Sequence, residues 1–295
     1  MTRTFKISSL SLLLIAAAGL SACYMPTLSM KKQTAMRLAV PTGMMERQIP
    51  AQPYVITAFE RVTRKNDIAT IYIEGGQLVW DDFIKEREMA TPLNPLALHM
   101  STRDTSSNVI WLARPCQYTA KLDGTECTRE EFAAGRFSLT NLRSMNLALD
   151  NIQRKYGFTG FNLVGVGDGA GVAVHLAASR KDVKSLRTVA GMLDTDVFMD
   201  VYNPEPHEVV VDRTSNNPGM HASHLAGLPQ HHFVGEWDDT ISRDMAQHFR
   251  HAAGNSACVR VSEVKGVTNE KGWVNRWADL LKSPVDCKAG TAATQ

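Results

Sequence analysis

The stretch Phe161-Asn162-Leu163-Val164-Gly165-Val166-Gly167-Asp168-Gly169-Ala170-Gly171 decides the fold expected of this chain. Apolar and β-prone residues lead into a cluster of glycines, and small apolar residues follow through Ala178. This order predicts a strand, a tight turn and a helix, because glycine tolerates the backbone conformations that tight turns require. Gly165 and Gly169 flank the central Gly167, which has no side chain that could react.

Apolar runs alternate with helical patterns along the rest of the 295 residues. Strands are expected at residues 54–62, 68–73, 108–113, 186–190, 231–234 and 258–264, and helices at 94–100, 142–156, 245–252 and 273–281. Residues 194–229 are expected to be irregular and residues 288–295 to be loose. This alternation predicts an α/β fold, with a mostly parallel sheet covered by helices on both faces.

The N-terminus indicates export and a lipid anchor. Arg3 and Lys6 precede an apolar run over residues 7–19, which is too short to span a bilayer comfortably. Leu20-Ser21-Ala22-Cys23 then resembles the bacterial lipobox, in which the cysteine is diacylated and becomes the new N-terminus. We therefore expect a signal peptide over 1–22, a lipid on Cys23 and a polar tether over 23–50. An ordinary signal peptide with a chance cysteine is the alternative.

Four cysteines remain beyond Cys23, and an even number in an exported chain predicts two disulfides. The pairs closest in sequence are Cys116 with Cys127 and Cys258 with Cys287, although four cysteines allow three connectivities. Zinc is not expected on these cysteines, because no Cys-x-x-Cys occurs. The net charge of +2, without blocks of like charge, does not indicate a nucleic-acid partner.

Six blocks between Ile71 and Trp277 carry a family resemblance. They are Ile71-Tyr72-Ile73-Glu74-Gly75-Gly76, Thr91-Pro92-Leu93-Asn94-Pro95, Leu112-Ala113-Arg114-Pro115-Cys116-Gln117-Tyr118, Thr188-Val189-Ala190-Gly191-Met192-Leu193-Asp194, Pro229-Gln230-His231-His232-Phe233-Val234-Gly235, and residues 266–273. Together, and in this order, they resemble a group of proteobacterial α/β-hydrolase proteins. The resemblance implies an α/β-hydrolase fold for residues 51–287.

The resemblance also implies where a catalytic triad would lie. The family uses a serine at the centre of the glycine turn, an acid after a later strand and a histidine after the last strand. Asp238 takes the place of the acid, but Gly167 stands at the serine position and Asn269 at the histidine position. Glycine offers no nucleophile, and an asparagine amide cannot take a proton near neutral pH. The resemblance thus implies a degenerate member of the family.

Asp168 is the obvious candidate for a relocated nucleophile, but the pattern around it fits poorly. Val166 and Ala170 flank it at the positions where an elbow needs the smallest residues. The residue after a nucleophile also donates its N–H to the oxyanion, where a projecting carboxylate would oppose the developing charge. We therefore expect that removing this carboxylate would favour a rebuilt site.

Gly75 and Gly76 complete the expected site as an oxyanion-like turn, together with Asp168. In the family this turn, at the end of an early strand, forms part of the oxyanion hole. A tight turn that needs a positive φ explains the two glycines equally well. Both interpretations stay open at this point.

Two cofactor hypotheses compete with these interpretations. Gly165-x-Gly167-x-x-Ala170 matches a loose dinucleotide fingerprint, but that turn usually follows the first strand of its sheet. His221-x-x-His224, with His231 and His232 nearby, suggests a metal site. His231 and His232 point to opposite faces of a strand, so at most one of them faces any given site. No cofactor and no metal are expected.

The sequence therefore predicts a lipid-anchored cell-envelope protein with a catalytically inactive α/β-hydrolase fold, acting in binding or envelope structure. Its expected partners are the membrane, through Cys23, and a protein or a small apolar ligand in the cleft. Tyr24, and not the aspartate that favours inner-membrane retention, follows Cys23, so the outer membrane is favoured. An active esterase- or lipase-like hydrolase with a relocated nucleophile is the alternative, and a dinucleotide-binding enzyme is a distant third.

Overall fold

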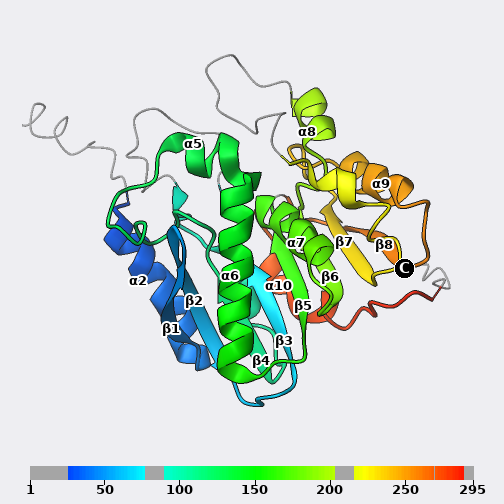
Figure 1. Cartoon of the computed structure of the whole chain (residues 1–295). Helices are drawn as coiled ribbons and strands as arrows, with labels where there is room; N and C mark the ends of the chain where they lie inside the picture. The colour runs from blue at the N-terminus through cyan, green and yellow to red at the C-terminus, as the bar shows by residue number, and fades with distance from the viewer. Residues whose placement is uncertain (1–25, 77–89, 203–215, 269, 289–295) are drawn as a thin grey trace, which may run out of the picture.

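The computed structural model describes residues 26–76, 90–202, 216–268 and 270–288 (Figure 1). The strands in this part of the chain form one sheet in the order β1-β2-β4-β3-β5-β6-β7-β8. Their bounds are Met45–Ala51, Tyr54–Val62, Ile68–Ile73, Asn108–Leu112, Gly160–Val166, Val183–Val189, Gln230–Gly235 and Val259–Val264 for β1 to β8. Only the pairs β1–β2 and β2–β4 are antiparallel, which confirms the predicted mostly parallel sheet.

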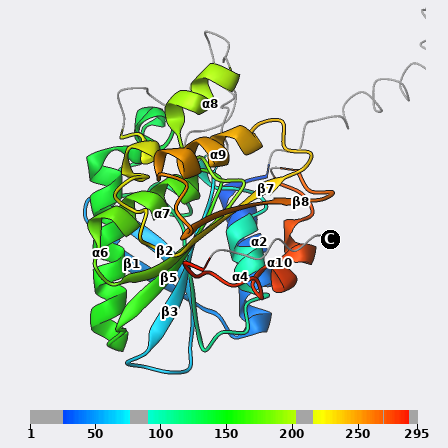
Figure 2. The ribbon, with the colours of Figure 1, turned by 90° about the vertical axis from the view of Figure 1, so that its right-hand side faces the viewer.

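Helices cover both faces of the sheet, as Figures 1 and 2 show. On one face lie α2 (Leu28–Ala39), α4 (Leu96–Ser101) and α10 (Trp273–Leu280). On the other lie α6 (Leu139–Tyr156), α7 (Asp168–Ser179) and α9 (Arg243–Ala252). The short helices α5 (Arg129–Phe132) and α8 (Thr195–Tyr202) lie in connections that follow β4 and β6. This two-sided cover confirms the predicted layers.

The two apolar cores follow from the period of two along the strands. Ile71 and Ile73 of β3 pack into the core beneath α6 and α7, whereas Tyr72 between them packs on the α10 side. The Tyr72 hydroxyl donates to Asp104 (2.8 Å) and accepts from Trp277 Nε1 (3.0 Å). Helix α10 is thereby fixed to the centre of the sheet.

The prediction of a polar tether over residues 23–50 is wrong for most of that range. Residues 28–39 form helix α2, and β1 begins at Met45 as an edge strand paired with β2. The buried face of α2 consists of Lys31, Ala35 and Ala39, with spacing i, i+4 and i+8. Alanines and the aliphatic stem of a lysine give only a weak hydrophobic pattern. The amphipathic helix was therefore not predicted from the sequence.

The stretch expected to be irregular over 194–229 also contains regular structure. Helix α8 begins at Thr195, and a 3₁₀ turn spans Pro218–His221. The Asp194 carboxylate accepts the N–H groups of Asp196 and Val197, so it caps α8. Residues 203–215 lie outside the described part, as do the expected signal peptide, Cys23 and most of the expected loose tail.

Both disulfides form with the connectivity closest in sequence. Cys116 pairs with Cys127, and Cys258 pairs with Cys287. The second bond fixes the chain after α10 to the start of β8. Among the described residues, no helix has the length and apolar character needed to cross a bilayer.

Removing the Cys258–Cys287 bond should lower the free energy of unfolding by roughly 2–4 kcal/mol, because the unfolded chain regains the freedom that the crosslink removes. The bond joins residues 29 apart, against 11 for Cys116–Cys127. A variant with serine at Cys258 and Cys287 should therefore be less stable than a variant with serine at Cys116 and Cys127. Denaturant titration measures the difference, and free thiols or crossed pairs in non-reducing peptide maps would contradict it.

Candidate functional site

The turn between β5 and α7 has the backbone geometry of a strained elbow. Gly167 adopts φ 56° and ψ −128°, a region that residues with side chains rarely occupy. Its N–H donates to the Val189 carbonyl (3.0 Å), and its own carbonyl accepts from Met192 (2.9 Å). The elbow is thus held by bonds to β6 and to the segment that follows β6.

The two flanking glycines are required by close packing, whereas the central one is not. A Cβ at Gly169 would lie 2.5 Å from the carbonyl oxygens of Ile73 and Glu74, and one at Gly165 would overlap the backbone of Ala170. A Cβ at Gly167 would meet only Gly75 Cα, at 3.8 Å. The turn therefore has room for a side chain at residue 167, although the sequence supplies none.

The Asp168 side chain is fully buried, and its carboxylate lies next to the Gly75–Gly76 turn. Its Oδ2 pairs with Arg114 Nη2 (2.9 Å) and Arg136 Nη1 (3.2 Å), and the Asp168 and Arg136 side chains have no exposed surface. Burial lowers the pKa of Arg136 to about 10, and the Asp168 carboxylate opposes this shift. The expectation that this carboxylate crowds the oxyanion side stays a prediction; the structure adds that two arginines hold the carboxylate in place.

The Gly75–Gly76 turn lies beside the elbow and is held from below. The fully buried Glu74 carboxylate accepts from Gly75 N–H (3.1 Å), Trp111 Nε1 (2.8 Å) and the first turn of α4. Burial raises the pKa of Glu74 to about 7, although these donors favour its charged form. Because Gly75 N–H already donates to the Glu74 carboxylate, it is not free to bind an oxyanion at residue 167.

Residues 112–118, one of the six blocks that resemble the family, support this turn. Arg114 Nε donates to the Glu74 carbonyl (3.1 Å), and Gln117 Nε2 donates to the Gly75 carbonyl (2.7 Å). Sequence reasoning did not assign any role to Glu74, Arg114, Gln117 or Arg136. For Glu74 and Arg114, the available signal was a charged residue inside a family block next to an apolar strand, because charges occur in cores only when they are paired.

Asp238 follows β7, two strands from the elbow and thus roughly 10 Å across the sheet. Its Oδ1 accepts from Ile241 N–H (2.7 Å) and Thr240 N–H (3.1 Å), and its buried Oδ2 has no hydrogen-bond partner among the described residues. Burial raises the pKa of Asp238 to about 6. Oδ2 of Asp238 can therefore still accept a hydrogen bond at the place where the family positions its acid.

The loop after β8 is fixed against the Asp238 turn. Trp237 N–H donates to the Val267 carbonyl (3.0 Å), and Gly266 N–H donates to Glu236 (2.9 Å). Residues 266–268 thereby lie beside the acid position, as the family order implies. Asn269, the residue expected at the histidine position, lies outside the described residues.

The histidines that suggested a metal site form separate contacts. His231 bonds to Ser262 (2.8 Å) and His232 to Thr188 (2.8 Å), from opposite faces of β7. His221 Nε2 lies 2.9 Å from Nδ1 of the buried His175 on α7. In the described part of the chain, no three histidines, cysteines or carboxylates are grouped as metal ligands.

An aspartate–histidine pair that the sequence did not reveal lies near the elbow. His248 Nδ1 of α9 is 3.1 Å from Asp194 Oδ2, and the His248 side chain is 53% exposed. Asp194 follows β6 two residues after Met192, whose N–H bonds to Gly167. The remaining Asp194 bonds cap α8 and bind Asn217, so this carboxylate joins three segments at the elbow edge.

Acid should weaken the fold through His175. The Asn216 carbonyl can only accept, so His175 Nε2 carries the proton and Nδ1 accepts from His221. Burial lowers the pKa of His175 from 6.5 to about 4. Its contribution to stability is complete above pH 6.5 and is lost as the pH falls toward 4, because the unfolded chain binds the proton first.

This contribution is on the order of 3 kcal/mol between pH 7 and pH 4. We expect His175→Gln to lose that much less stability than the native protein over this range. Urea titrations at several pH values measure the difference, with His251→Gln on the exposed end of α9 as the control. Parallel curves for the native protein and His175→Gln would contradict the assignment.

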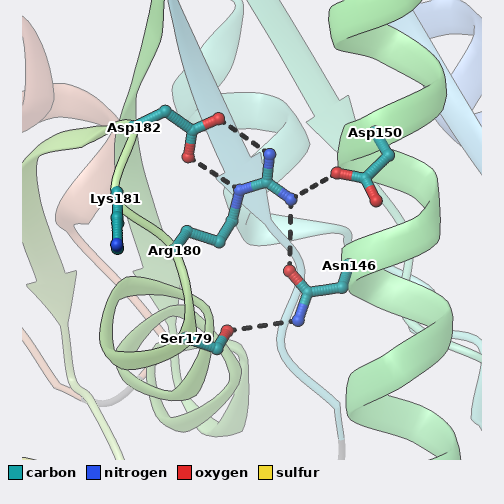
Figure 3. Close-up of a pocket in the computed structure, with 6 residues that line it drawn as sticks. All are labelled: Asn146, Asp150, Ser179, Arg180, Lys181 and Asp182. Atoms are coloured by element: carbon teal, nitrogen blue, oxygen red, sulfur yellow. Dashed lines mark hydrogen bonds and ion pairs between the residues drawn. The ribbon is translucent and has the colours of Figure 1, made fainter.

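The hollow shown in Figure 3 lies away from the elbow. It has a volume of about 440 Å³ and is lined by Asn146, Asp150, Ser179, Arg180, Lys181 and Asp182. Arg180 occupies its centre and pairs with Asp150 (2.7 Å) and Asp182 (2.8 Å). Because Ser179 ends α7 and Gly167 precedes its start, the hollow and the elbow lie at opposite ends of that helix.

Comparison with solved structures identifies the fold. An esterase of Pyrococcus furiosus has a TM-score of 0.55 at 10% identity, with 81% of this chain and 88% of that chain covered. An alpha-beta serine hydrolase homologue from Coxiella burnetii has a TM-score of 0.51 at 12% identity, with 80% and 93% covered. The acylaminoacyl peptidase of Pyrococcus horikoshii has a TM-score of 0.53 at 12% identity, with 80% of this chain covered, and the chain spans 39% of that enzyme.

The chain therefore has the α/β-hydrolase fold, as its sequence predicted. At these identities the likeness concerns the fold alone. No family model matches the sequence, and no curated protein matches it. The proteobacterial lipoprotein family stays a prediction from sequence motifs.

Proposed function

We propose that this protein is a lipid-anchored component of the cell envelope whose α/β-hydrolase domain binds a ligand or a partner without catalysing hydrolysis. The observation that carries the proposal is the elbow at Gly167. Its strained backbone and its tightly packed flanking glycines are those of a nucleophile turn, yet its centre has room for a side chain and bears none. A scaffold that keeps this shape without the reactive group fits a binding role.

The burial of Asp168 weighs against the alternative of a relocated nucleophile. A nucleophilic carboxylate must reach a substrate, whereas the Asp168 side chain is fully buried between Arg114 and Arg136. Both arginines stabilise its negative charge and lower its tendency to share electrons with a substrate. A structural role for this carboxylate explains the contacts without any catalysis.

The anchor rests on Cys23 and its lipobox-like sequence. Two acyl chains on one cysteine suffice for stable membrane attachment. The two disulfides support an oxidising compartment outside the cytoplasm. We place the protein at the periplasmic side of the outer membrane, because Tyr24 follows the cysteine.

Metabolic labelling with a fatty-acid analogue tests the anchor. The native chain should carry the label and fractionate with membranes, and Cys23→Ser should lose both properties. Label retained by the Cys23→Ser variant would contradict the proposal. An assay of ester hydrolysis tests the absence of catalysis. The purified protein should hydrolyse a test ester no faster than the same protein does after heat unfolding.

A further inference from the structure

Among the described residues, large apolar side chains are exposed at both edges of the sheet, and five of them lie at the edge that carries the elbow. Large apolar side chains exposed at this edge are Leu93 (49%), Leu122 (46%), Leu139 (60%), Met220 (65%) and Trp237 (64%). They follow β3, β4, β6 or β7, or begin α6. Because the carboxyl ends of parallel strands meet at one edge, these five side chains share the edge with Gly167.

Helix α2 also begins at this edge. Lys31, in its first turn, donates through Nζ to the Thr91 carbonyl (2.8 Å), and Thr91 Oγ1 accepts from Tyr118 N–H (2.8 Å). Thr91 and Tyr118 lie in the connections after β3 and β4, next to the Gly75 turn. The chain therefore enters the domain beside the elbow and not at the far end of the sheet.

The connection to the anchor is short. Four residue steps separate Cys23 from Thr27, the residue that caps α2. A chain of this length spans at most about 14 Å. If Cys23 carries lipid, as the proposed function has it, the start of α2 lies within this distance of the bilayer surface. A tether of 28 residues would have left the orientation of the domain free, but this one does not.

We propose that the carboxyl edge of the sheet docks on the lipid bilayer through these exposed apolar side chains. Trp237 suits this position, because the indole ring prefers the boundary between headgroups and acyl chains. Side chains of this kind reach about 5–10 Å into that boundary. The docked domain presents its Gly167 elbow to the membrane, so the ligand that enters there is an amphiphile from the lipid surface.

Site-specific photocrosslinking on the full-length protein in cell membranes tests the docking. A benzophenone amino acid replaces Met220 or Leu139 at the elbow edge. The matched controls are Met45, which is 69% exposed at the start of β1, and Leu147, which is 40% exposed in the middle of α6. Lipid adducts at residues 220 and 139 should exceed those at 45 and 147 by about fivefold or more, since only the former reach the interface.

Acyl mass on the N-terminal peptide is measured in the same samples. An acylated protein with equal lipid adducts at all four positions would overturn the docking and leave the anchor intact. Adducts with another protein, or with a second copy of this chain, at residue 220 would also overturn it. Lipid adducts confined to residues 220 and 139 on a chain without acyl groups would support the docking and contradict the anchor.

Discussion

Replacing Asp168 by alanine is expected to destabilise the protein by about 3–5 kcal/mol, because it leaves two buried arginines without their counter-charge. Arg114 and Arg136 both bond to the same Oδ2 and are 5% and 0% exposed. Burial and, to a smaller extent, the charge of Arg114 already lower the pKa of Arg136. Denaturant titration at neutral pH measures this loss of stability. If the loss exceeds the stability of the native protein, the variant will be unfolded or proteolysed in cells.

A surface ion pair provides the control for this prediction. Arg243 and Glu263 are 3.2 Å apart, with side chains 58% and 37% exposed, so Glu263→Ala should change stability by at most about 1 kcal/mol. An Asp168→Ala protein as stable as Glu263→Ala would contradict the role of the buried ion pairs. This loss of stability would oppose any gain that removing Asp168 brings to a rebuilt catalytic site.

The double change Gly167→Ser with Asn269→His is expected to produce slow labelling by a serine-directed fluorophosphonate. The new serine side chain fits, because a Cβ at residue 167 meets only Gly75 Cα at 3.8 Å. The elbow already holds the strained backbone that a nucleophile requires. Oδ2 of Asp238, which has no hydrogen-bond partner in the described part of the chain, is available to orient the new histidine at residue 269.

Adding Asp238→Asn to this double variant should slow the labelling by at least about tenfold, because the amide favours the wrong histidine tautomer. The labelling should stay well below that of an active hydrolase, since Gly75 N–H is bound to Glu74 and small misplacements cost much of the rate. Equal labelling with and without Asp238→Asn would show that Asp238 does not take the acid position.

Much of the fold was readable from the sequence because strong local patterns coincide with it. The Phe161–Gly171 stretch predicted β5, the elbow and α7, and Gly157 ends α6 with a φ of 72°, as a glycine after a helix should. Helix α2 was missed because its buried face is built from Lys31, Ala35 and Ala39. Alanine buries little apolar area, so tertiary contacts and not periodicity place this helix.

The site was only partly predictable. The elbow at Gly167 came from local sequence, and the packing of Gly165 and Gly169 explains why that pattern is specific. The burial of Asp168 was not predictable, because Arg136 lies 32 residues away and reaches it only in the folded chain. Pairing across such a distance follows from topology, which a single sequence does not display.

Incubation of the native protein with a fluorophosphonate probe tests the central claim most directly. The account predicts no covalent adduct, because Gly167 offers no nucleophile and Asp168 is held by Arg114 and Arg136. The Gly167→Ser, Asn269→His variant serves as the positive control in the same scaffold. Steady labelling of the native protein, traced by mass spectrometry to one serine, would show that the protein is an active hydrolase with its site elsewhere.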